Sequence, residues 1–75
     1  MRIKVSTKHE LYNIQTGKNH YYDEDFYFNY DNNIISIEGS SWKKHVKDME
    51  EGLDQIKKYF YGSKYHIVDL TRMLN

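Results

Sequence analysis

The sequence DFYFNYDNNIISIE, residues 25–38, decides the fold of this chain. In its first half Phe26, Phe28 and Tyr30 alternate with Tyr27 and Asn29, and in its second half two isoleucines alternate with Ser36 and Glu38. Such alternation is typical of strands with one buried face. The Asn-Asn pair between the halves tolerates the positive φ angles of a two-residue hairpin turn. This turn pairs Tyr30 with Ile35 and Phe28 with Ile37, so the apolar residues of both strands face the same side.

A long amphipathic helix is predicted after this hairpin. Six apolar residues recur at spacings of 4, 3, 4, 3 and 4, and they form one stripe on a helix: Trp42, Val46, Met49, Leu53, Ile56 and Phe60. Ser40 and Ser41 precede the stripe as N-cap candidates, and Gly62 follows it where a glycine commonly ends a helix. We therefore predict a helix over about 41–61, packed on the apolar face of the hairpin.

Residues 7–16 fit either a strand or a short helix. Residues 7–10 have the spacing of a capping box, which would begin a helix that stops near Gly17. Alternatively, Tyr12 and Ile14 alternate with a polar residue, and residues 16–18 form a hairpin turn. We favour the strand.

The two ends of the chain are predicted to be strands, over residues 3–5 and 65–70. Asp69 is alternatively the cap of a final helical turn through Leu74. The favoured order is β-β-β-α-β, a small α+β domain with a mainly antiparallel sheet and one long helix on one face. The helical alternative for residues 7–16 gives βαββαβ, the ferredoxin-like order.

The composition is typical of one small domain over residues 1–75. The 11 basic and 11 acidic side chains cancel, which removes the global electrostatic argument for a nucleic-acid binder. The absence of cysteine excludes disulfides and thiol catalysis, and it fits a reducing compartment. The N-terminus lacks the apolar run of a signal peptide, and no apolar stretch approaches the ~20 residues that span a bilayer. We therefore expect a cytoplasmic protein without membrane association.

Catalytic motifs are missing from the sequence. It has no GxSxG elbow, no HExxH and no glycine-rich phosphate loop, so we expect neither enzymatic activity nor a cofactor. His45 and Asp48 would share a face of the predicted helix, but nothing indicates a third ligand, and we expect no metal.

Tyrosine is unusually frequent, with eight in 75 residues. Tyr21 and Tyr27 share a strand face with Asp23 and Asp25, opposite the predicted core. Tyrosine supplies large contact area and a hydroxyl, which suits interfaces, and the aspartates suit a basic partner. These four residues are the predicted protein interface. The alternative is that tyrosines only fill the second sheet face of a chain that lacks alanine.

Trp42, Lys43, Lys44 and Lys47 lie at the start of the predicted helix. Lysines there oppose the helix dipole, whereas free backbone N–H groups at a helix start suit an anion. This cluster is the alternative site, for an anion or nucleic acid. Lys44 and Lys47 also have acidic partners at i+4, so they fit a solvated helix face as well.

These features together predict a small non-enzymatic interaction module, an inhibitor or regulator that binds a host protein or associates with itself. The chain has no alanine or proline and nine lysines against two arginines. This bias follows A/T-rich codons and indicates a low-G+C bacterium or its phage or plasmid. We therefore expect the protein to come from a phage or another mobile element. A nucleic-acid-binding module is the alternative.

Overall fold

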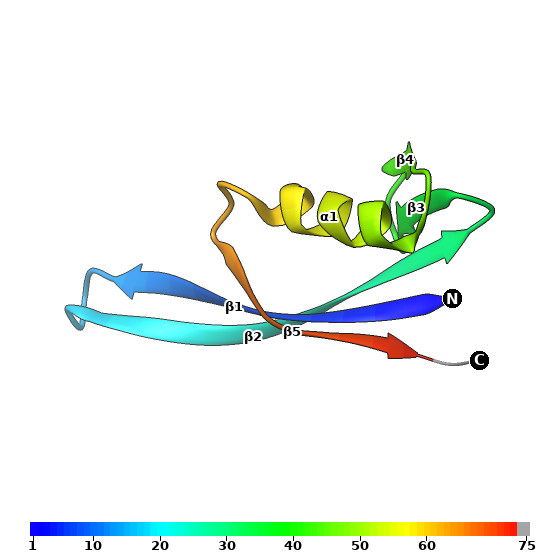
Figure 1. The fold of residues 1–75 in the computed structure, drawn as a ribbon. Coiled ribbons are helices and arrows are strands. Elements are labelled where there is room, and N and C mark those ends of the chain that lie inside the picture. The colour runs from blue at the N-terminus through cyan, green and yellow to red at the C-terminus, as the bar shows by residue number, and fades with distance from the viewer. Residues whose placement is uncertain (74–75) are drawn as a thin grey trace.

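A computed structural model describes residues 1–73 and shows a small α+β domain (Figure 1). Within these residues, one antiparallel sheet of five strands carries one helix on one face. The elements are β1 (Arg2–Asn13), β2 (Lys18–Asp31), β3 (Ile34–Ile37), β4 (Lys43–His45), α1 (Met49–Phe60) and β5 (Tyr65–Met73). The strand order across the sheet is β4-β3-β2-β1-β5. The predicted α+β class is confirmed, and residues 1–73 contain one strand more than predicted, β4.

The hairpin of β2 and β3 has the predicted register. Tyr30 pairs with Ile35, and Phe28 pairs with Ile37. The two turn residues Asn32 and Asn33 have φ angles of 50° and 61°. This left-handed conformation matches the twist of the flanking strands, which explains why asparagines connect them.

The strand interpretation of residues 7–13 is confirmed. Ile3, Val5 and Thr7 are buried in alternation along β1, and β1 pairs with β2 as far as Asn13. The helical interpretation, and with it the ferredoxin-like alternative, is wrong because β2 supplies these residues with a hydrogen-bonding partner along their whole length.

The C-terminal strand is also confirmed and is longer than predicted. β5 pairs antiparallel with β1, from Tyr65 opposite His9 to Met73 opposite Arg2. A helical turn that begins at Asp69 is therefore wrong up to Met73, while residue 74 lies outside the described residues.

The helix begins later than predicted, at Met49 instead of about 41. The side chain of Asp48 caps it, with Oδ1 accepting from the N–H of Glu51 at 2.9 Å. Acidic residues occupy the first turn and lysines the last turn, as the helix dipole favours. A start near residue 41 would place lysines at the positive end of the dipole. Those residues instead extend the sheet beside β3.

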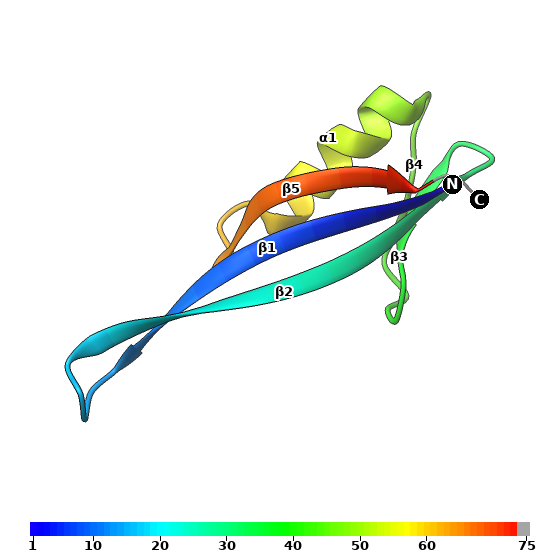
Figure 2. The same cartoon turned by 90° about the horizontal axis from the view of Figure 1, so that it is seen from below.

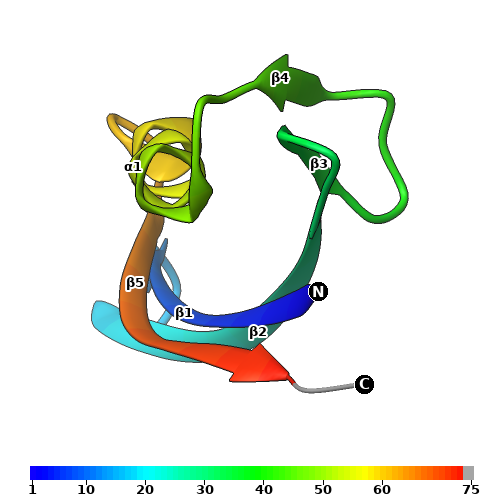
Figure 3. The ribbon, with the colours of Figure 1, turned by 45° about the vertical axis from the view of Figure 1, so that its right-hand side comes forward.

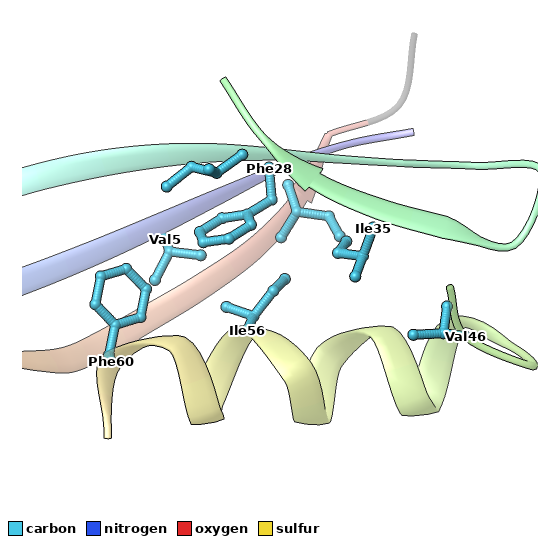
Figure 4. Close-up of a cluster of buried hydrophobic side chains, with 8 residues drawn as sticks. Val5, Phe28, Ile35, Val46, Ile56 and Phe60 are labelled. Atoms are coloured by element: carbon cyan, nitrogen blue, oxygen red, sulfur yellow. The ribbon is translucent and has the colours of Figure 1, made fainter. Parts of the chain in front are cut away.

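The core lies between α1 and the concave face of the curled sheet (Figure 3). Figure 4 shows its side chains meeting from the strands and the helix. The buried apolar residues are Ile3, Val5, Phe28, Ile35, Ile37, Val46, Ile56 and Phe60. Half-buried residues, including Trp42, Met49 and Leu53, pack around them. The apolar stripe predicted on the helix therefore faces the core, although its first two members precede α1.

The molecule is elongated, with extents of 48 × 24 × 20 Å. The cause is the hairpin of β1 and β2, which extends well beyond α1 and β5 (Figure 2). We call its outer part, residues 10–21, the arm. The last residue of β1 that pairs with β5 is His9, so the arm consists of two strands and a turn.

Candidate interaction surface

The four residues of the predicted interface lie on the sheet face opposite α1, which we call the open face. Tyr21, Asp23, Asp25 and Tyr27 alternate along β2 with residues that face the helix. Tyr21 is 68% exposed. Tyr27 is half-buried because the guanidinium of Arg2 lies 4.0 Å from the centre of its ring. The outer end of the open face is therefore more accessible than the inner end.

The open face carries charges of both signs. Lys4 Nζ lies 3.6 Å from Asp25 Oδ2, and Lys8 stands directly opposite Asp23 in the register of β1 and β2. Each aspartate of the predicted interface thus has a lysine as its cross-strand neighbour. The negative charge that was expected to attract a basic partner is largely balanced within the face itself.

The inner end of the open face is fixed by a polar cluster around Glu38. Arg2 donates two hydrogen bonds to this carboxylate, from Nε at 2.8 Å and from Nη2 at 3.0 Å. Asn29 Nδ2 donates a third at 2.9 Å. The hydrogen bonds from Arg2 and then from Asn29 favour the ionised carboxylate and lower the pKa of Glu38. The hydrogen bond to Glu38 raises the pKa of Arg2.

The arm exposes large apolar side chains on both of its faces. Leu11 is 44% exposed, Tyr12 65% and Ile14 86%, in addition to Tyr21. Leu11 and Ile14 border a shallow hollow with His20. The sequence patterns gave Tyr12 and Ile14 no site role, because alternation does not reveal how far a hairpin extends past its helix.

An aromatic cluster closes the base of the arm. The His9 ring stacks on Tyr22 with centroids 5.4 Å apart, and it meets the edge of Tyr65 at 5.0 Å. His9 Nδ1 is buried and finds no hydrogen-bond partner among the described residues. The cluster lies where the three-stranded part of the sheet becomes the two-stranded arm.

The predicted anion site is not at a helix start in this structure. Lys43 and Lys44 belong to β4, where successive side chains point to opposite faces, and Lys47 follows the strand. The Trp42 ring packs edge-on against Phe28 and Tyr59, with centroids 5.9 and 5.1 Å away. The tryptophan is therefore part of the margin of the core and is not a free platform for a base.

The actual start of α1 is acidic. The Asp48 cap accepts the N–H of Glu51, and the surface around it is lined by Glu50 and Asp54, with Lys47 as its one cation. A helix start capped by its own carboxylate does not suit an anion. His45 lies on β4 and Asp48 at the cap, so the two do not share a helix face, and residues 1–73 contain no group of three metal-ligating side chains.

Comparisons of the chain with protein-family models, with curated proteins and with solved structures gave no match. Across residues 1–73, the structure contains no helix with the length and apolar character needed to cross a membrane.

Proposed function

We propose that this protein is a non-enzymatic interaction module that binds a partner protein through the arm and the adjacent open face. In this proposal it is an inhibitor or regulator from a phage or another mobile element, and its partner is a host protein. The observation that carries the proposal is the set of large apolar side chains on the arm that no described residue covers.

The exposure of these side chains has an energetic consequence. A folded protein gains roughly 25 cal/mol for each Å² of apolar surface that it removes from water. The exposed tyrosines, leucine and isoleucine of the projecting hairpin forgo that gain in the free protein, and a partner surface would recover it. An isolated two-stranded hairpin is also only marginally stable, so a bound partner would order the arm further.

The composition of the arm fits a protein partner better than a nucleic acid. Tyr12 and Tyr21 stand on the open face beside Glu10, and the only lysine of the arm is Lys18, next to the turn. The nucleic-acid alternative depends instead on the exposed lysines 43, 44 and 47, which do not form one patch. The nuclease arm of the test below distinguishes this alternative.

The test is capture of a partner from lysate of a low-G+C bacterial host, with and without nuclease. We expect the double variant Tyr12→Ser/Tyr21→Ser to keep its circular dichroism spectrum and to lose capture at least tenfold. Removing two aromatic anchors from an interface costs about 2 kcal/mol or more. Tyr61→Ser is the matched control, because Tyr61 is 90% exposed but lies after α1 and away from the arm.

Two results would contradict the proposal. Equal capture by the double variant and by wild type would place the interface elsewhere. Capture that disappears with nuclease, and that weakens steeply with salt, would support the nucleic-acid alternative.

A further inference from the structure

We infer that the outer edge of β2 pairs with the same edge of a second copy of this chain, in an antiparallel arrangement about a two-fold axis. β3 pairs with β2 only from Phe28 to Asp31. Along residues 18–26, β2 has β1 on one side, and no described residue pairs with its other side. This stretch of strand presents a row of unpaired backbone groups, which is a template for another strand.

The direction of these backbone groups follows from the hydrogen bonds at the inner end of β2. Tyr30 exchanges both backbone hydrogen bonds with Met1, so even-numbered residues of β2 point their N–H and C=O groups toward β1. Tyr27 O accepts from the N–H of Glu38 on the other side. The groups that point to the free edge therefore belong to the odd-numbered residues Asn19, Tyr21, Asp23 and Asp25.

The charges along this edge are self-complementary only in the antiparallel direction. Lys18 and His20 lie in its first half, and Asp23, Glu24 and Asp25 lie in its second half. An antiparallel second copy sets Lys18 and His20 of each strand near Glu24 of the other on the helix side of the sheet, whereas Asp23 and Asp25 lie on the open face. A parallel second copy in register would set acids against acids. Glu24 therefore favours antiparallel pairing, and the acidic run does not only block the edge.

A two-fold axis through Tyr22 uses this edge most fully. It pairs Tyr22 with Tyr22 and His20 with Glu24, and it reaches Lys18 opposite Phe26. Because the axis is perpendicular to the sheet, both helices lie on the same side and the two open faces join. Tyr22 turns its backbone groups toward β1, so this central pair is the close, non-hydrogen-bonded type with Cα atoms roughly 4.5 Å apart.

The other edges of the sheet are poorer templates. β4 has three residues, which give too few hydrogen bonds. β5 has nine, but its pairing with β1 shifts register between Ser6 and Thr7, and such an irregularity twists an edge away from regular pairing.

Sedimentation and disulfide trapping test this inference. We expect wild-type protein to form dimers at concentrations up to about 1 mM, the range of weak specific association.

The chain has no cysteine, so any disulfide in a single-cysteine variant joins two copies. Tyr22→Cys should form that disulfide under mild oxidation, because a 4.5 Å Cα separation lies within the range of disulfide geometry. Tyr61→Cys is the control and should remain mostly monomeric.

Substitutions of His20 test the charge pairing. His20→Lys should tighten the dimer and His20→Glu should weaken it, each by roughly 2- to 30-fold in Kd, since the pair with Glu24 occurs twice. A wild-type protein that remains monomeric overturns the inference. A dimer whose Kd is unchanged by both His20 substitutions overturns it as well. So does disulfide formation by Tyr61→Cys that is as fast as that by Tyr22→Cys. The partner capture proposed above uses the open face and is tested with the Tyr12→Ser/Tyr21→Ser variant. The two proposals therefore fail independently.

Discussion

Glu38 shows how a single residue ties the ends of the sheet together. It lies just after β3, yet its carboxylate is held by Arg2 from the start of β1 and by Asn29 from β2. These contacts join the N-terminal strand to the hairpin through side chains as well as through the backbone. The Arg2 guanidinium that binds Glu38 also covers the ring of Tyr27. Arg2 therefore determines how much of this end of the open face is accessible.

The lowered pKa of Glu38 predicts a loss of stability in acid. The folded state releases this proton more readily than the unfolded state, whose carboxyl has its ordinary value of 4.5. The stabilisation is thus present above pH 4.5 and is lost as the pH falls through the lowered folded value. Glu38→Gln should reduce this loss, measured by urea unfolding at pH 7 and at about pH 3. Glu10→Gln, on the arm, is the control. Equal acid dependence in wild type and Glu38→Gln would show that the cluster contributes nothing.

At the scale of elements, α1 depends on its packing against the sheet. A helix of 12 residues is marginal in isolation, and its stability comes from the apolar side chains that it buries. Gly52 lies in the middle of α1 and is buried against the sheet. Glycine costs about 1 kcal/mol relative to alanine in a helix interior.

Gly52→Ala is expected to stabilise the protein by about 0.5–1 kcal/mol. A Cβ atom at this position meets Tyr30 Cδ2 at 3.5 Å, Val46 Cγ2 at 3.8 Å and Ile35 Cβ at 3.9 Å. These are ordinary van der Waals distances, so the methyl group fits. Gly52→Leu should instead destabilise by about 1–3 kcal/mol through overpacking. Urea unfolding measures both changes, and a destabilising Gly52→Ala would mean that the helix and sheet cannot accept the methyl group.

The whole molecule is divided into a packed body and a projecting arm. In the body the strands have the helix on one face and buried side chains beneath it. In the arm the same two strands continue with neither α1 nor β5 beside them. Local stability follows buried apolar contact, so it should fall sharply along β1 and β2 beyond His9.

Amide hydrogen exchange tests this division. In dilute, monomeric protein we expect amides of residues 10–21 to exchange at least a hundredfold faster than hydrogen-bonded amides near Val5 and Phe28. The reason is that the arm opens locally while the body exchanges only on larger unfolding. Uniform protection along both strands would contradict this expectation. Protection of the amides of Tyr21 and Asp23 at high concentration would instead reflect pairing of the β2 edges.

The sequence by itself determined the elements whose signals are local. The hairpin register of Phe28 and Tyr30 follows from alternation and from a turn that only a few residue types accept. The residues of the core stripe from Val46 to Phe60 likewise follow from periodicity. These patterns depend on neighbours a few positions apart, so they can be read without the fold.

Only the tertiary structure decided the features that depend on distant partners. Residues 7–16 carry local signals for both helix and strand, with the strand favoured, and pairing with β2 makes residues 7–13 a strand. Residues 43–45 lie between Trp42 and Val46, two members of the stripe predicted on the helix, yet pairing with β3 makes them β4, and Asp48 then becomes the cap. The lysines beside Asp23 and Asp25 come from β1. The arm exists because β1 and β2 extend beyond α1 and β5. In each case the deciding contact joins residues far apart in the chain, and local pattern carries no information about such contacts.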